Sequence, residues 1–150
     1  MASTVTSATL KVQIQEDIDI NGTKRGAKIV HSFSDIAQVD ERIMSVPTHE
    51  VSVLLLSSSA GAGTYKTSTF RYARLTNLDD TNYLTITLLS GSAGSKNVQK
   101  LPPKTSMVLC SAAMSGSSAG TAFGAFSNFT AVKASADSSS VDMSLFIAAT

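Results

Sequence analysis

The chain has 150 residues, with 12 basic against 11 acidic side chains and a single cysteine. This balance excludes the basic surface field that attracts nucleic acid or an anionic membrane, and one cysteine excludes an internal disulfide. Charged residues make up 15% of the chain, against roughly 25% in typical soluble domains. Ser, Thr, Ala and Gly must then cover much of the surface, which favours an exterior that is partly covered by neighbouring subunits.

Residues 1–7 have neither the basic nor the apolar region of a secretory signal, so we expect synthesis in a cytoplasm. They are polar enough to form a flexible N-terminal arm ahead of one domain over residues 8–150. The longest uninterrupted apolar stretch, residues 53–56, is far too short to span a membrane.

The first strong structural signal is a β-hairpin. Leu10, Val12 and Ile14 alternate with polar residues, which is typical of a half-buried strand, and the pattern continues to residue 20. The dipeptide Asn21-Gly22 follows, and its tolerance of positive φ makes it a strong hairpin turn. We therefore expect a returning strand over residues 27–33.

Further strands follow at intervals of about 8 to 15 residues, with turn residues between them. The segment 38–46 is also compatible with one or two helical turns, whereas residues 50–56 are apolar on both sides and predict a central strand. Pro102 and Pro103 cannot lie inside a ladder, so the chain must bend or change sheets there. The other expected strands are 67–76, 83–89, 97–101, 104–111, 126–134 and 141–148.

These elements predict an all-β domain, namely an antiparallel β-sandwich of about 8 to 10 short strands. A jelly-roll strand order is one option.

The residues that could carry chemistry form no catalytic, metal or cofactor constellation. His31 and His49 have no metal-like spacing, and a zinc site needs at least three protein ligands. We expect His31 to be partly buried and Cys110, in an apolar run, to be a buried, inert thiol. The adjacent Asp79 and Asp80 fall in a turn, where carboxylates are usually solvated or cap backbone groups rather than bind calcium or act as general acids.

Two segments are candidate assembly contacts because they are polar or rich in small residues. One is the N-terminal arm, and the other is the loop over residues 112–125. Phe123, Phe126 and Phe129 are spaced by three, and they are either core or inserted into a neighbouring subunit, with core favoured. The candidate contacts are Ala2, Ser3, Thr4, Val5, Met114, Ser115, Gly116, Phe123 and Phe126.

Two passages resemble small virion structural proteins of tailed bacteriophages, especially those of marine and cyanobacterial hosts. They are RYARLTNLDDTNYLTIT at residues 71–87 and VQKLPPK at residues 98–104. The likeness extends over about residues 8 to 111. It implies a part that is copied many times on a virion, such as a capsid decoration or cement protein, or a component of a fibre or tail.

The resemblance and the composition together predict a non-enzymatic virion subunit. Its expected partners are other virion proteins and further copies of the chain. The alternative is a fibre or tail module that recognises a receptor or carbohydrate. Sugar sites usually expose aromatic platforms, and the chain has no Trp and only three Tyr. An enzyme on a jelly-roll scaffold would require a cluster of histidines and carboxylates that the sequence does not suggest.

Overall fold

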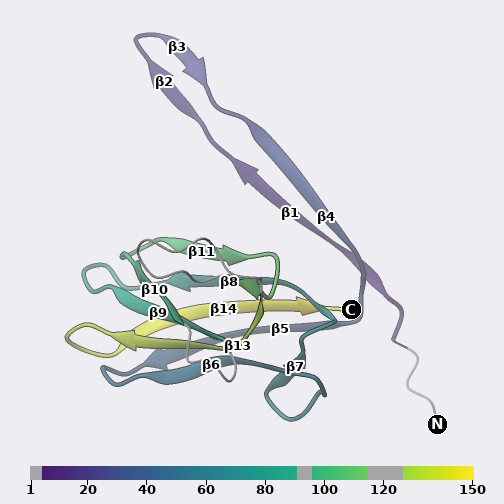
Figure 1. Cartoon of the computed structure of the whole chain (residues 1–150). Coiled ribbons are helices and arrows are strands. Elements are labelled where there is room, and N and C mark those ends of the chain that lie inside the picture. Colours follow the sequence, from purple (N-terminus) through teal and green to yellow (C-terminus); the bar gives the residue numbers. More distant parts are fainter. Residues whose placement is uncertain (1–4, 91–95, 115–126) are drawn as a thin grey trace, which may run out of the picture.

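The computed structural model describes residues 5–90, 96–114 and 127–150, which form strands joined by turns (Figure 1). The strands are β1 (Ala8–Gln15), β2 (Ile18–Ile20), β3 (Thr23–Arg25), β4 (Lys28–Ile36), β5 (Gln38–Val46), β6 (Val51–Ser57), β7 (Thr64–Lys66), β8 (Phe70–Asn77), β9 (Leu84–Ser90), β10 (Lys96–Leu101), β11 (Ser106–Leu109), β12 (Ala113–Met114), β13 (Ser127–Ala136) and β14 (Val141–Ala149). Within these residues, no helix is long and apolar enough to cross a membrane.

Strands β5 to β14 form the body of the molecule, a sandwich of two sheets. The β14 sheet has the order β11-β8-β14-β5, and the β13 sheet has the order β10-β9-β13-β6-β7, with β12 attached to β13. All pairs are antiparallel except the short parallel pair β6–β7. The predicted all-β sandwich is confirmed, and β6 is central in its sheet as residues 50–56 predicted.

The strand order of the body is that of a jelly roll. Its eight principal strands are nested, so that the first pairs with the last (β5–β14) and the second with the seventh (β6–β13). The third likewise pairs with the sixth (β8–β11), and the fourth pairs with the fifth (β9–β10). The pairs β8–β14 and β9–β13 join these hairpins into two sheets. This is one long antiparallel hairpin rolled into a sandwich, and the jelly-roll option is confirmed.

The core lies between the two sheets and follows from alternation along the strands. In β14, Met143, Leu145 and Ile147 point inward and are completely buried, whereas Ser144 and Phe146 lie on the outer side. Phe129 on β13 is also buried and packs edge-on against Phe70 at 6.0 Å between ring centroids. The prediction that Phe129 belongs to the core is therefore confirmed. Phe123 and Phe126 lie outside the described residues.

A hydrogen-bonded turn closes one end of the body. The buried Asn77 donates from Nδ2 to the carbonyl oxygens of Asn82 (2.9 Å) and Leu101 (3.2 Å). Its Oδ1 accepts a hydrogen bond from the Asp79 backbone N–H at 3.0 Å. Asp79 in turn caps the N–H groups of Thr81 and Asn82, so the expected capping role of this carboxylate is confirmed. The Pro102-Pro103 prediction is also confirmed, because β10 and β11 lie in different sheets.

The predicted strand count of 8 to 10 was too low. The short strands β7 and β12 lie in segments without clear alternation, and the first predicted strand is divided into β1 and β2 at Glu16 and Asp17. Its return is divided into β3 and β4 at Gly26, which has a φ of 137°. A Cβ atom at Gly26 would collide with the backbone carbonyl oxygen of Glu16, so this close crossing requires glycine.

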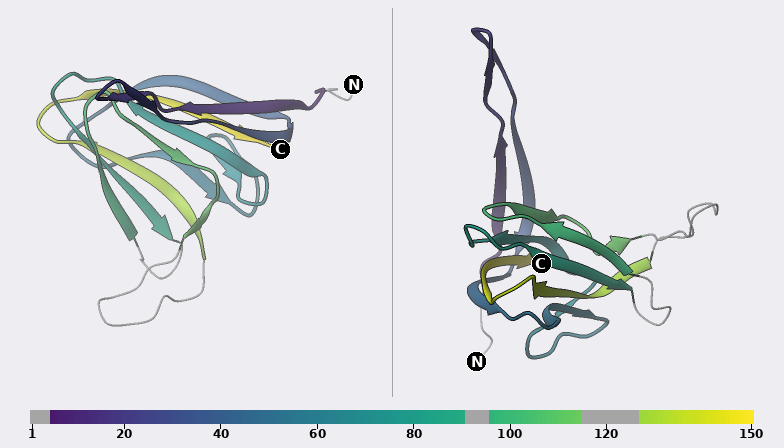
Figure 2. Two further views of the ribbon diagram at one scale, coloured as in Figure 1. Left: turned by 90° about the horizontal axis from the view of Figure 1, so that it is seen from above. Right: turned by 90° about the vertical axis from the view of Figure 1, so that its left-hand side faces the viewer.

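Strands β1 to β4 form a separate feature, the long hairpin (residues 8–36). It leaves the body beside β5 and projects far beyond the sandwich, with β2 and β3 at its tip (Figures 1 and 2). The sequence predicted half-buried strands here, and this expectation was wrong for the outer part, where every residue from Gln13 to Ser32 is exposed.

Candidate functional site

The long hairpin is built by local sequence signals. Asn21 and Gly22 both have positive φ, 54° and 79°, as a two-residue hairpin turn requires. The Asp19 carboxylate accepts a hydrogen bond from the Gly22 N–H at 2.9 Å. From this turn the same register continues to the foot, through the pairs Ile20–Thr23, Ile14–Ile29 and Leu10–Phe33. A single ladder therefore carries the tip away from the body.

One face of this hairpin carries most of its apolar side chains, with Glu16 and Arg25 among them. Cross-strand partners in an antiparallel ladder share a face, so Leu10 lies with Phe33 and Ile14 with Ile29. Alternation along the outgoing strand brings Ile18 and Ile20 to the same face. We call this set the apolar stripe: Leu10, Val12, Ile14, Ile18, Ile20, Ile29 and Phe33. The opposite face is mainly polar, with one exposed apolar residue, Val30. Its polar residues include Lys11, Gln13, Gln15, Asp19, Lys24, Lys28 and Ser32.

The inner part of the apolar stripe is covered by the body. Leu10, Val12 and Phe33 pack against a small cluster on the outer face of the β14 sheet, which contains Tyr72, Phe146 and Ala148. The ring of Tyr72 lies 5.8 Å from that of Phe33 and 6.0 Å from that of Phe146. Burial raises the pKa of the Tyr72 hydroxyl above its usual 10.0, although the Arg74 charge acts in the opposite direction. The hydroxyl therefore stays neutral at physiological pH.

The outer part of the stripe has no cover in the described residues. Ile14 is 43% exposed, Ile29 48%, Ile20 50% and Ile18 52%. They lie on the same face of the hairpin as the apolar side chains that are packed at its foot. The hairpin thus presents a row of isoleucines to solvent beyond the edge of its own body.

The outer face of the β14 sheet is only partly covered by the hairpin foot. The register places Val108, Arg74, Phe146 and Glu41 side by side in one row across the four strands. The next row outward consists of Ser106, Thr76, Ser144 and Ile43. The two edge residues Val108 and Ile43 are 41% and 69% exposed. The first row lines a cleft beneath β1, and the second row is open, with small polar side chains and the exposed Ile43.

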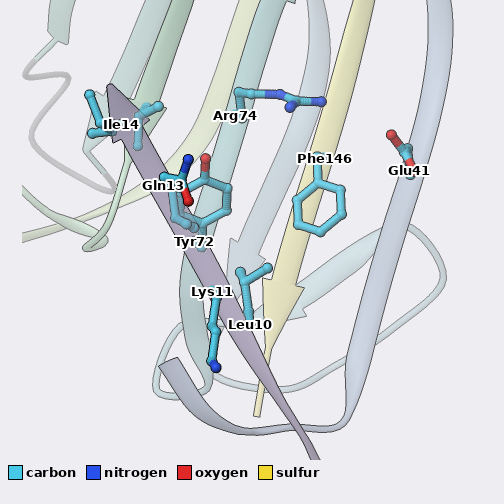
Figure 3. A pocket seen from close by; sticks show the side chains of 10 residues that line it. Leu10, Lys11, Gln13, Ile14, Glu41, Tyr72, Arg74 and Phe146 are labelled. Atoms are coloured by element: carbon cyan, nitrogen blue, oxygen red, sulfur yellow. The ribbon is translucent and has the colours of Figure 1, made fainter. Parts of the chain in front are cut away.

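A cleft of about 400 Å³ separates β1 from this face where the hairpin diverges. Figure 3 shows β1 crossing in front of the sheet, with Tyr72, Arg74 and Phe146 on the far side of the cleft. The Arg74 guanidinium carbon lies 5.9 Å from the centre of the Phe146 ring. Its Nε is shielded from solvent and has no hydrogen-bond partner among the described residues. The cleft therefore offers a cation beside an apolar surface.

The structure places the sequence-predicted contact residues apart. Val5 is 62% exposed, and Met114 is buried against the core in the short strand β12. Ala2, Ser3, Thr4, Ser115, Gly116, Phe123 and Phe126 lie outside the described residues.

Two predictions about reactive side chains were wrong. Cys110 is exposed, because it follows the end of the edge strand β11 on the side that faces away from the core. His31 is exposed because its strand belongs to the projecting hairpin rather than to a sheet of the body.

Asp80 is paired with Lys104 at 2.8 Å on the surface. Within residues 5–90, 96–114 and 127–150, no three His, Cys, Asp or Glu residues converge as metal ligands.

Sequence reasoning missed the exposed stripe, although a signal was present. Alternation over residues 10–20, an Asn-Gly turn and a matching return describe a hairpin with arms longer than most strands of the body. Charges also gather at its outer end, with Glu16, Asp17 and Asp19 on the way out and Lys24, Arg25 and Lys28 on the return. A long hairpin with charges beside isoleucines indicates a projecting element more than a core strand.

No protein-family model matches the chain, and neither a curated protein nor a solved structure was found to match it.

Proposed function

We propose that this chain is a non-enzymatic structural subunit of a larger protein assembly, in which the long hairpin docks onto a neighbouring protein. The observation that carries the proposal is the uncovered outer part of the apolar stripe. An isolated two-stranded hairpin is marginally stable in water, and three or more strands or a packing partner are needed for stability. Covering the four outer isoleucines would contribute roughly 1 kcal/mol each, since about half of each side chain is still exposed.

The proposed assembly is a bacteriophage particle, with the chain as a capsid decoration or cement subunit made in the host cytoplasm. This part of the proposal is supported by the resemblance of residues 71–87 and 98–104 to small virion proteins. The jelly-roll order of the body supports it by analogy, since viral capsid domains use this architecture, as do lectins and cupins. A cement role also fits a projecting hairpin, because many copies add modest contacts into a firm shell.

The test compares the full chain with a variant whose hairpin is shortened in register. Glu16 N–H donates to the Ala27 carbonyl at 2.9 Å, and hydrogen-bonded pairs alternate from there. By this alternation, Ile20–Thr23 at the natural turn and Val12–His31 near the body are both hydrogen-bonded pairs. Replacing residues 13–30 by Asn-Gly therefore moves the natural turn to the edge of the body and removes the outer stripe.

Size-exclusion chromatography with light scattering, alone and with shells of the particle's major capsid protein, reads out association. We expect the full chain to form larger species or to bind the shells. The shortened chain should do neither, and the melting temperature of its body should stay within a few degrees. A full chain that stays monomeric in both conditions would refute the proposal, as would a shortened chain that associates equally well.

A further inference from the structure

We infer that the partner of the outer hairpin is a second copy of this chain, and that it docks on the open part of that copy's β14 sheet. This inference rests on the proposed function and names the neighbour that the hairpin binds. In this arrangement the apolar stripe of one copy lies across the row of Val108, Arg74, Phe146 and Glu41 on the next copy.

The sheet face already binds this stripe within one chain. Leu10, Val12 and Phe33 pack on Tyr72, Ala148 and Phe146, and the open rows continue the same surface along the same strands. The outer isoleucines continue the apolar surface of the foot towards the tip of the hairpin. Ile14 still borders the cleft above its own sheet, whereas the ladder carries Ile18 and Ile20 away from that sheet (Figure 2). A second copy supplies a face that is known to accept such residues.

The charges of the two surfaces are complementary. The stripe face of the hairpin carries Glu16 on the outgoing strand, then Ile18, and then Arg25 opposite Ile18 on the return. The receiving row carries Arg74, then the Phe146 ring, and then Glu41. Docking with Ile18 on Phe146 brings the Glu16 carboxylate to the Arg74 guanidinium and brings Arg25 to Glu41.

The spacings of these charges agree. Arg74 and Glu41 stand on strands that are two positions apart, a separation of roughly 10 Å at the usual strand spacing. Glu16 and Arg25 are two residues apart along one strand and one strand apart across it, a separation of roughly 8 Å. All four side chains are long enough to absorb the difference. Docking would also give the shielded Arg74 Nε an acceptor that the described residues do not provide.

The contact joins two different surfaces, so its symmetry is head-to-tail. Such a contact repeats from copy to copy and yields a closed ring or an open chain rather than a simple two-fold dimer. This difference makes the inference testable by mixing two defective proteins.

The first protein carries Ile18→Ser and Ile20→Ser, which disable the hairpin and leave the sheet face intact. The second carries Ile43→Lys and Val108→Lys, which disable the face and leave the hairpin intact. All four positions are exposed, so both bodies should fold. Gln15→Ser with Lys28→Ser is the matched control, since this cross-strand pair lies on the opposite face of the outer hairpin.

We expect the control to self-associate like the unchanged chain and each defective protein to be monomeric in light scattering. Mixed together, the two defective proteins should form a 1:1 dimer and nothing larger, because each retains one half of the contact. A mixture that stays monomeric would overturn the inference. So would a face-defective protein that still self-associates, which would indicate contact between two hairpins. The proposed function would survive that result, because association would still depend on the hairpin.

A charge exchange gives a second measurement on exposed residues. Arg25→Glu alone and Glu41→Lys alone should each weaken self-association by about tenfold or more, since like charges then face each other. The chain carrying both changes should regain most of the loss, because hairpin and face are reversed together. Additive losses in the double variant would overturn the inference, as would an unchanged chain that is monomeric at all concentrations. Shell binding by such a monomer would still support the proposed function.

Discussion

The body and the long hairpin have the same local pattern but different sources of burial. In β14, alternate residues from Met143 to Ile147 are completely buried because the opposite sheet covers them. In the hairpin, alternate residues from Leu10 to Ile20 are covered only at the foot, and Ile18 is 52% exposed. Alternation thus specifies that a strand has an apolar face. Whether the cover comes from the same chain or from another one depends on contacts distant in sequence.

The largest expected effect is a difference in stability when the same truncation to alanine is made in the body and in the hairpin. Leu145→Ala removes a completely buried side chain from the centre of the core, and such truncations lower the free energy of unfolding by about 2 to 5 kcal/mol. Ile18→Ala makes a comparable truncation on the hairpin, where surface changes usually stay within about 0.5 kcal/mol. Urea unfolding of the monomer, followed by circular dichroism, measures both values.

The shortened hairpin with residues 13–30 replaced is the control for that comparison, because Ile18 is absent from it. Its body should lose stability on Leu145→Ala by the same amount as the full chain. Equal destabilisation by Leu145→Ala and Ile18→Ala would contradict the comparison, since it would mean that hairpin and body unfold as one cooperative unit.

Local signals made much of the fold predictable. The Asn21-Gly22 turn, the alternation in β1 and β14 and the change of sheets at Pro102-Pro103 depend on backbone preferences within a few residues, and all three are found in the structure. The nesting of β5 with β14 depends on pairing across most of the chain, so the sequence left the jelly roll as one option among sandwiches.

The candidate site was predictable only in part, for the same physical reason. The apolar stripe could be read from Leu10, Val12, Ile14, Ile18 and Ile20, but its exposure could not. The receiving row joins residues from four strands that meet only after the body has folded. The errors at His31 and Cys110 have this origin too, because local apolar neighbours indicate a strand face and not whether another layer covers it.

A smaller effect is expected at the turn that closes the body. Asn77→Ala removes two donated hydrogen bonds and one accepted one from a buried site, and it leaves the Leu101 carbonyl without this partner. Unmet buried polar groups destabilise by about 1 to 3 kcal/mol. Asp19→Ala in the hairpin turn removes one exposed hydrogen bond and should leave the unfolding of the body unchanged. Urea unfolding of both variants makes the comparison.

Asn77→Asp refines this measurement because it keeps the Oδ1 acceptor and removes the Nδ2 donor. We expect it to be at least as destabilising as Asn77→Ala, since it also brings a carboxylate next to two carbonyl oxygens. A variant as stable as the unchanged chain would show that the donated bonds to Asn82 and Leu101 contribute little to closing the body.

The smallest expected effect is a pH dependence that belongs to the body alone. Hydrogen bonds from the backbone N–H groups of Asn82 and Thr81 lower the pKa of the Asp79 carboxyl below its usual 3.8. A carboxylate with a lowered folded-state pKa stabilises the fold fully above the unfolded value, and this contribution disappears as the pH falls through the folded value. The melting temperature should therefore fall in acid, below about pH 4, by slightly more in the unchanged chain than in Asp79→Asn. The shortened hairpin should show the same difference, because residues 13–30 make no contact in this turn. Parallel acid profiles for the unchanged chain and Asp79→Asn would show that this cap does not contribute measurably to the stability of the body.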